Sequence, residues 1–114
     1  MEDCLFCKII AGEIPGNKVY EDDMVYAFYD FDPKAPEHIL IIPKKHIKSI
    51  LEVGEGDFCY IEAMIKAAQK LAAEKGFAQD GFRLVFNTGA NGGQTVHHLH
   101  LHLLGGREFG WPPG

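Results

Sequence analysis

The feature that most constrains this chain is a run of alternating histidine and leucine over residues 96–104, VHHLHLHLL. Successive side chains of a β-strand point to opposite faces of the sheet. A strand here places its leucines on the face that belongs in the core. The opposite face then carries three imidazoles about 7 Å apart, which is the spacing of alternate residues in a strand. These three are His98, His100 and His102.

The remaining sequence predicts four more strands and two helices. Apolar residues step by three and four from Asp57 to Lys75, which indicates one long amphipathic helix. A shorter helix over 4–10 is expected to begin at a capping Asp3. Because neighbouring strands are joined by short turns, the sequence predicts a single α+β domain over residues 1–114, with the long helix on one face of a five-stranded antiparallel sheet. The strands are expected at 19–20, 24–29, 38–43, 82–88 and 96–104.

Composition excludes several classes of protein. Eleven Lys and Arg residues against sixteen Asp and Glu give a formal charge of −5, whereas a non-specific nucleic-acid binder carries a basic face. The apolar run over 39–42 is far too short for a membrane span of about 20 residues. The opening residues 1–3 lack the basic and apolar regions of a signal peptide, and three cysteines are too few for a disulfide framework. We therefore expect a soluble, cytoplasmic protein that binds neither nucleic acid nor membrane.

Three imidazoles on one face point to chemistry rather than packing. Each cation formed there disfavours the next, so crowding titratable rings costs stability that packing alone does not return. Two kinds of site fit: a metal centre with three histidine ligands, or a nucleophilic histidine with proton-transferring neighbours. The glycine-rich loop 89–95, GANGGQT, immediately precedes the histidines and can turn several backbone N–H groups toward an anion. It therefore favours a phosphate held beside a histidine nucleophile.

The run VHHLHLHLL resembles the His-x-His-x-His signature of the histidine triad superfamily, and nearly the whole chain is similar to its Hint branch. The similar stretches are FCKIIAGEIP, VYEDDMVYAFYDFDPKAPEHILIIPKKHI and GGQTVHHLHLHLLGGREFGWPPG. The resemblance implies a homodimer whose subunits join their sheets into one continuous sheet. It also implies binding of AMP-like purine nucleotides and hydrolysis of nucleoside 5′-phosphoramidates, with aminoacyl-adenylates as a further substrate class. The implied chemistry requires no cofactor.

The resemblance also implies roles for individual residues. His100 would be the nucleophile that attacks the α-phosphorus, with its Nδ1–H held by the backbone carbonyl of His98. His102 would lie against the α-phosphate oxygens, and His38 would be hydrogen-bonded to the other histidines. Asp30 would accept hydrogen bonds from the ribose hydroxyls, although its residue type and place before a turn also suit a turn-capping aspartate.

Further residues match the substrate-binding positions of the family. Those around the ribose and phosphate are Asn87, Gly93, Gln94 and Thr95. Those of the apolar base pocket are Phe6, Ile9, Phe28 and Phe31, and simple core packing explains each of these equally well. Trp111, in the closing WPPG, is expected to dock on the substrate side or on another subunit. Two positions depart from the family: Thr95 stands where serine is common, and His97 stands where an aromatic residue is usual.

Two cysteines suggest a metal site. Cys4 and Cys7 lie one helical turn apart, as zinc ligands often do, but they read equally well as two buried thiols on a small helix. Some relatives in the superfamily bind structural zinc through such a pair together with two histidines. Carried over to this sequence, those histidines are His46 and His98, so the resemblance implies a structural zinc held by four residues.

Other functions stay open at the level of sequence. A rival hydrolase would cleave dinucleoside polyphosphates, but the WPPG ending and residues 105–107 favour the Hint branch. A nucleotide-binding regulator with little turnover would belong to a different class, and the intact histidine at position 100 weighs against it. A three-histidine metal enzyme lacks an acidic ligand on the same strand.

Overall fold

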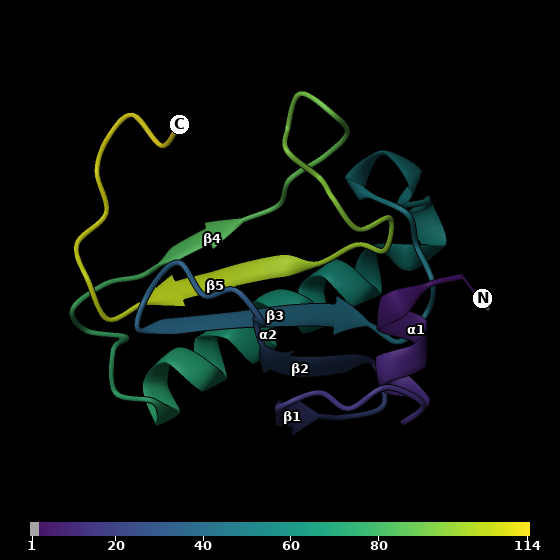
Figure 1. The fold of residues 1–114 in the computed structure, drawn as a ribbon, viewed down its shortest axis with the longest axis horizontal. Helices are drawn as coiled ribbons and strands as arrows, with labels where there is room; N and C mark the ends of the chain where they lie inside the picture. The colour runs from purple at the N-terminus through teal and green to yellow at the C-terminus, as the bar shows by residue number, and fades with distance from the viewer. Residues whose placement is uncertain (1–2) are drawn as a thin grey trace.

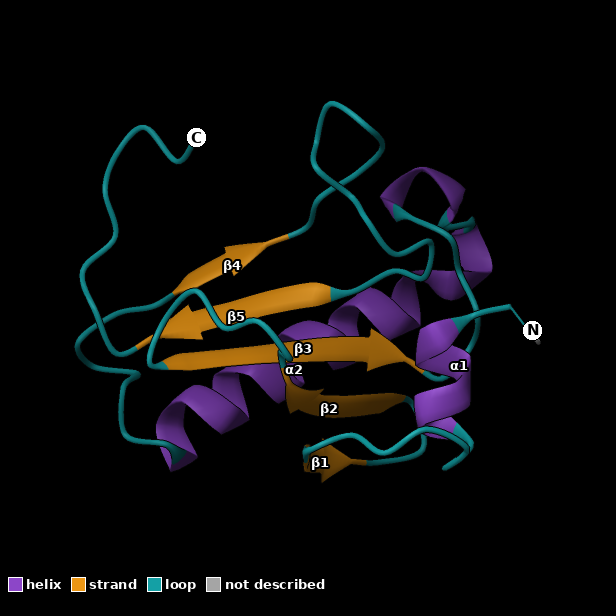
Figure 2. Ribbon diagram, viewed as in Figure 1, coloured by secondary structure: helices purple, strands orange, loops and turns teal. Residues whose placement is uncertain are grey.

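The computed structural model describes residues 3–114 and contains one five-stranded antiparallel sheet within them, in the order β1-β2-β3-β5-β4 (Figures 1 and 2). The expected α+β fold is confirmed. The expectation that residues 1–3 are not part of a signal peptide rests partly on Met1 and Glu2, which lie outside the described residues. The elements are α1 Leu5–Ile10, β1 Lys18–Glu21, β2 Val25–Tyr29, β3 Glu37–Pro43, two 3-10 turns Ile50–Glu52 and Glu55–Asp57, α2 Phe58–Glu74, β4 Arg83–Val85 and β5 Leu101–Gly105.

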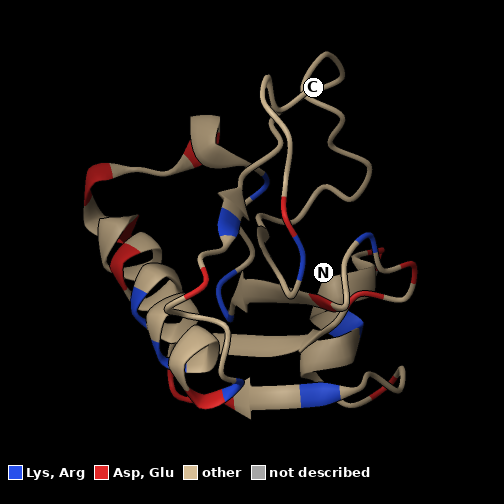
Figure 3. Cartoon of the chain, turned by 90° about the vertical axis from the view of Figure 1, so that its left-hand side faces the viewer, with Lys and Arg blue, Asp and Glu red and all other residues tan. Residues whose placement is uncertain are grey.

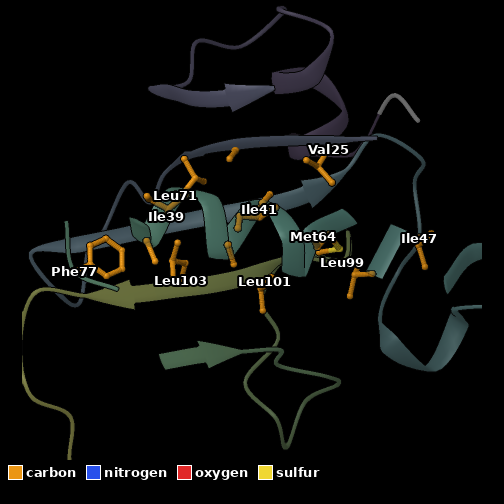
Figure 4. Close-up of a cluster of buried hydrophobic side chains, with 14 residues drawn as sticks. Val25, Ile39, Ile41, Ile47, Met64, Leu71, Phe77, Leu99, Leu101 and Leu103 are labelled. Atoms are coloured by element: carbon orange, nitrogen blue, oxygen red, sulfur yellow. The ribbon is translucent and has the colours of Figure 1, made fainter. Parts of the chain in front are cut away.

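The main core lies between the sheet and α2. It includes Ile39 and Ile41 of β3 and Leu101 and Leu103 of β5, which face the buried side of the long helix (Figure 4). Residues alternate faces along a strand, so the intervening Leu40 and Ile42 of β3 point the other way. These pack with β2 and α1 in a second cluster on the opposite face, formed by Cys4, Phe6, Ile9, Tyr26, Phe28, Leu40 and Ile42.

Strand β3 is therefore covered on both faces, and every residue from His38 to Pro43 is buried. A continuous apolar run is the sequence pattern expected of such a central strand. Charged residues lie on α2, in the loops and at a few strand positions (Figure 3). Among the described residues, no helix has both the length and the apolar character that crossing a membrane requires.

Strand β5 begins later than predicted. It starts at Leu101 rather than at Val96, because its pairing with β3 ends at Ile41 opposite Leu101. Residues 96–100, the lead-in of β5, are not part of this pairing. The Leu99 amide instead donates to the Ile47 carbonyl at 2.7 Å. Leu99 still joins the main core, so the alternation of faces continues beyond the strand.

Two other boundaries differ from prediction. Strand β4 covers Arg83–Val85 rather than 82–88, because its register with β5 stops where Val85 lies opposite His102. The cap of α1 is Cys4, not Asp3, since the Cys4 Sγ accepts a hydrogen bond from the Cys7 amide at 3.3 Å. A thiol thus takes the place of the expected carboxylate at this helix start.

Candidate active site and cysteine–histidine cluster

Strands β3 and β5 bring two histidines and an aspartate together. In the antiparallel register, His102 lies opposite Leu40 and His38 lies opposite Leu104, so the two imidazoles are diagonal neighbours. The His38 Nε2 is 2.9 Å from the His102 Nδ1 and 3.4 Å from an Asp30 carboxylate oxygen. The other Asp30 oxygen accepts from the Asp32 amide at 2.8 Å. Asp30 therefore caps a turn and also faces the histidine pair.

His100 has the tautomer of a nucleophile. Its Nδ1 lies 2.7 Å from the His98 carbonyl oxygen. A carbonyl can only accept, so Nδ1 carries the proton and Nε2 keeps its lone pair. The Phe6 ring packs against the imidazole in a T-shaped arrangement, with ring centroids 5.2 Å apart, and the centroid of the His102 ring lies 5.0 Å away. The ring is thus held by a hydrogen bond and by packing.

An open cavity of about 480 Å³ lies beside His38 and His102. Within residues 3–114, the His102 Nε2 is the buried side-chain nitrogen that has no hydrogen-bond partner. His100 is only 7% exposed and is not among the residues that line the cavity, and its Nε2 makes no hydrogen bond to the described residues. The cavity is lined by Asp30, Asp32, Lys34, His38, Val85, Asn87, Thr95, His102 and Leu104.

Burial keeps these imidazoles neutral. It lowers the pKa of His102 to about 4, and the neighbouring His100 and His38 add to the effect because each cation would repel the next. Burial also lowers the pKa of His100, against the opposing hydrogen bond to the His98 carbonyl and the nearby Asp30 charge. The pKa of His38 is lowered by the same cause. At neutral pH each ring therefore offers one lone pair and one N–H.

A second cluster joins α1 to the lead-in of β5. The His98 Nδ1 lies 3.2 Å from the Cys4 Sγ, 3.5 Å from the Cys7 Sγ and 3.2 Å from the His46 Nδ1. The Cys7 Sγ is also 3.4 Å from the His46 Nδ1. The ligand atoms of all four residues lie within 4.8 Å of one another. The four residues that the family resemblance selects are thus brought to one point.

The donor atoms of this cluster fit a tetrahedral zinc ion. Bonds of about 2.3 Å to sulfur and 2.0 Å to nitrogen give sulfur–nitrogen edges of about 3.5 Å and nitrogen–nitrogen edges of about 3.3 Å. The His98 Nε2 donates to the Pro43 carbonyl at 3.0 Å, which leaves the Nδ1 lone pair facing the cluster. Burial and the nearby Cys4 raise the pKa of the Cys7 thiol to about 11, whereas a bound cation deprotonates a coordinating thiol.

The structure places the predicted base-pocket residues in packing positions. Phe6, Ile9 and Phe28 are buried in the second cluster beneath His100 and do not line the cavity. Phe31 is 62% exposed, with its ring centroid 6.0 Å from that of Phe28. Of the predicted ribose and phosphate residues, the cavity brings together Asp30, Asn87 and Thr95.

Three predicted substrate residues lie away from the cavity lining. The Gln94 side chain holds its own loop together, since it accepts from the Gly89 amide at 3.0 Å and donates to the Lys48 carbonyl at 2.8 Å. Gly93 has φ of +82°, which only glycine adopts readily, so it serves the turn. Trp111 is 83% exposed. The lining also includes Asp32, Lys34, Val85 and Leu104, which no residue pattern marks as site residues.

Hydrolysis through a histidine nucleophile requires a neutral imidazole with a free lone pair, which His100 supplies, and a polar group beside it that can contact the substrate. His102, whose Nε2 has no partner among the described residues, lines the cavity and is such a group. The family model of the HIT domain matches residues 11–109. The chain therefore belongs to the HIT family, and the predicted resemblance is confirmed.

Individual relatives are similar over nearly the whole chain. The purine nucleoside phosphoramidase of Escherichia coli K12 is 49% identical over 109 residues, which cover 96% of this chain and 92% of that protein. A HIT family hydrolase from Legionella pneumophila is 53% identical, with a TM-score of 0.96 over 98% of this chain and 100% of that one. A histidine triad protein from Clostridium difficile is 48% identical, with a TM-score of 0.94 over 96% of both chains. The chain is a hydrolase of this family.

Proposed function

We propose that this hydrolase cleaves the P–N bond of purine nucleoside 5′-phosphoramidates through a nucleotidyl-histidine intermediate. The observation that carries the proposal is the His100 imidazole, whose Nδ1–H is held by the His98 carbonyl so that the Nε2 lone pair is free. The purine nucleoside phosphoramidase of E. coli, similar over 96% of this chain, supports the choice of substrate. Aminoacyl-adenylates, which also join an acyl-type group to AMP, are a second substrate class.

In the first step, the His100 Nε2 lone pair forms a bond to the α-phosphorus as the P–N bond breaks, and the departing amine takes up a proton from solvent. In the second step, water attacks the same phosphorus and loses a proton to solvent as the bond between phosphorus and Nε2 breaks, which releases the nucleoside monophosphate and restores the neutral imidazole. His102 Nε2 stabilises charge that develops on the phosphoryl oxygens. The His98 carbonyl keeps the proton of His100 on Nδ1 throughout, so the nucleophilic nitrogen is the one that faces substrate.

Substrate binding follows from the residues around the cavity. Asp30 accepts hydrogen bonds from the ribose hydroxyls, while Asn87 and Thr95 lie beside the phosphate. Gly93 and Gln94 hold the loop in the shape that turns its amides toward the phosphate. The base is placed against Phe31, which is exposed and packs on Phe28. Phe6, Ile9 and Phe28 support this apolar side from within the second cluster.

The proposal includes a homodimer joined through β4. This strand is at the edge of the sheet, and within residues 3–114 one row of its backbone N–H and C=O groups has no neighbouring strand. Leu84, in the middle of β4, is 36% exposed. Antiparallel pairing of two β4 strands would join the sheets of both subunits and cover this leucine. Trp111, which is exposed in the single chain, would dock on the partner subunit.

The proposal also includes one structural zinc ion, held by Cys4, Cys7, His46 and His98. The distances between their donor atoms match the edges of a zinc tetrahedron. A bound ion would link α1 to the lead-in of β5 and fix the ring of His98. The hydrolysis itself uses no cofactor.

The test compares the native chain with His100→Ala on adenosine 5′-phosphoramidate and on its guanosine counterpart. Removal of a nucleophile is expected to lower turnover at least about 10³-fold. Equal rates in the two proteins would refute the assignment of His100. A dinucleoside polyphosphate is assayed in parallel. If the native chain cleaves it faster than it cleaves the phosphoramidates, the chain is a dinucleoside polyphosphate hydrolase instead.

A further inference from the structure

We propose that Arg107, which lies outside the cavity, is a positioning residue that sets which nitrogen of His102 carries the proton. The inference rests on the proposed function, since it assigns His102 its role as a hydrogen-bond donor to the phosphoryl group. The connection runs through the backbone of Lys34 and the ring of His38. Each link is a hydrogen bond whose direction is fixed by chemistry.

The first link holds the Lys34 carbonyl. Arg107 donates from Nε and from Nη2 to the Lys34 carbonyl oxygen, at 3.1 and 3.0 Å. Its Nη1 donates to the Glu108 carbonyl at 3.0 Å, and the guanidinium lies 4.2 Å from the centroid of the Phe109 ring. A planar guanidinium held at three nitrogens and stacked on an aromatic ring has little freedom to move. It therefore ties the loop after Asp30 to the segment that follows β5.

The second link fixes the tautomer of His38. The Lys34 amide lies 3.0 Å from the His38 Nδ1. A backbone amide can only donate, so Nδ1 must hold a lone pair. Neutral His38 therefore carries its proton on Nε2. A proton on Nδ1 would meet the Lys34 N–H head-on, so the bond also opposes the other tautomer.

The third link transmits this choice to His102. The His38 Nε2–H donates to the His102 Nδ1 at 2.9 Å, with the Asp30 carboxylate 3.4 Å away as a further acceptor. The His102 Nδ1 is then an acceptor, and its proton must be on Nε2. That Nε2 is the buried atom left without a partner beside the cavity. In the proposed function, this N–H donates to a phosphoryl oxygen of the substrate.

The two adjacent histidines consequently have opposite tautomers. His100 presents a lone pair at Nε2, because the His98 carbonyl holds its Nδ1–H. His102 presents an N–H at Nε2, because the bonds that begin at Arg107 hold its Nδ1 lone pair. With the other tautomer, His102 would turn a lone pair toward a negatively charged phosphate and repel it. A loosened Lys34 peptide thus weakens the stabilisation of the transition state.

The direct test is long-range ¹H–¹⁵N NMR of the imidazole nitrogens in the full-length, substrate-free protein. We expect protonated Nε2 in His38 and His102, and protonated Nδ1 in His100. In Arg107→Met, the nitrogens of His38 and His102 are expected to shift toward values averaged over both tautomers. The matched control is Arg83→Met, because Arg83 also lies over Phe109 but contacts the Gly110 carbonyl rather than Lys34; its nitrogen shifts should equal those of the native chain.

A second pair of variants tests the bond from the Lys34 amide to His38, through which Arg107 acts, and does so even if Arg107→Met fails to fold. Lys34→Pro removes the donating N–H, whereas Lys34→Ala keeps it. The averaged shifts are expected in the proline variant alone. Identical shifts in both variants, or a native His102 protonated at Nδ1, would overturn the proposal.

Kinetics on adenosine 5′-phosphoramidate separate this inference from the proposed function. Loss of one transition-state donor typically costs 10²–10³-fold in kcat, so a donor that is loosened rather than removed should cost about ten-fold. We expect this fall in kcat for Arg107→Met, with KM nearly unchanged, and native values for Arg83→Met. A native chain with the expected tautomers but no phosphoramidase activity would refute the proposed function alone. An active native chain with unchanged tautomers in Arg107→Met would refute the role of Arg107 alone.

Discussion

Zinc binding at the cysteine–histidine cluster makes a quantitative prediction about stability. Four donor–donor distances already lie between 3.2 and 3.5 Å, so an ion can enter with little rearrangement. A ligand that binds only the folded chain, at a concentration 100 times its Kd, stabilises that chain by about 2.7 kcal/mol. For a chain of 114 residues, each kcal/mol raises Tm by about 3 to 5 °C. Addition of zinc to the metal-free protein should therefore raise Tm by roughly 10 °C.

The assay is calorimetry of the chelator-treated protein with and without zinc, together with metal analysis. We expect about one zinc per chain, and no rise in Tm for the double variant Cys4→Ser, Cys7→Ser. Cys59→Ser is the matched control, because Cys59 is exposed and lies outside the cluster; it should respond as the native chain does. An equal rise in Tm for the double variant, or no bound zinc with reduced thiols, would refute the assignment.

Three further predictions concern the ribose contact, the packing of β5 and acid stability. Asp30→Asn removes a charged hydrogen-bond acceptor worth about 1.5–3 kcal/mol, so kcat/KM for adenosine 5′-phosphoramidate should fall about 10- to 100-fold. A 2′,3′-dideoxy substrate lacks the ribose hydroxyls and should react equally with the native chain and the variant. An equal loss of kcat/KM on the two substrates would contradict the ribose contact. Gly105→Ala should destabilise the fold by about 1–3 kcal/mol in urea unfolding, because the new Cβ would lie 2.3 Å from the Phe77 ring. The control is Gly54→Ala, whose new Cβ would have no atom within 4 Å and which should destabilise the fold far less. The pKa of His102 is lowered from 6.5 to about 4 in the folded chain. Between these pH values the unfolded chain binds more protons, so the free energy of unfolding should fall as the pH is lowered from 6.5 to 4. If the free energy of unfolding depends on pH equally steeply in His102→Gln, another group is responsible.

The parts of the fold that follow from local pattern were predicted well. The apolar run of β3 and the helical periodicity of α2 are confirmed, because both segments are buried in the way that their patterns require. The limits of β5 were not predictable in this way. They depend on where β3 ends and on a hydrogen bond from Leu99 to Ile47, and both are properties of the folded chain.

The candidate site, too, follows only in part from the local sequence pattern. Alternation in the histidine run correctly separates the core leucines from His98, His100 and His102, even where the strand has not begun. It does not predict that His98 joins the cluster of Cys4 and Cys7, while His102 lines the cavity. The structure gives the Thr95 side chain a place in the lining. The cytoplasmic location stays a prediction.

Hydrogen bonds between distant residues explain what the sequence could not indicate. The bond from Arg107 to Lys34 joins residues 73 positions apart, and no sequence pattern predicts that the two meet. The direction of each imidazole hydrogen bond is equally invisible in the sequence, because it depends on which carbonyl or amide the fold places against the ring. The tautomers of His38 and His102 follow only from these neighbours.

The most direct test of the account is the identity of the atom that bonds to phosphorus. Native enzyme is mixed with adenosine 5′-phosphoramidate, quenched within one turnover and analysed by intact mass and peptide mapping under conditions that preserve phosphoramidate bonds. We predict one nucleotidyl group per chain, attached to His100 and missing in His100→Ala. Turnover with an adduct on another residue, or with none trapped at any quench time, would contradict the nucleophilic role of His100.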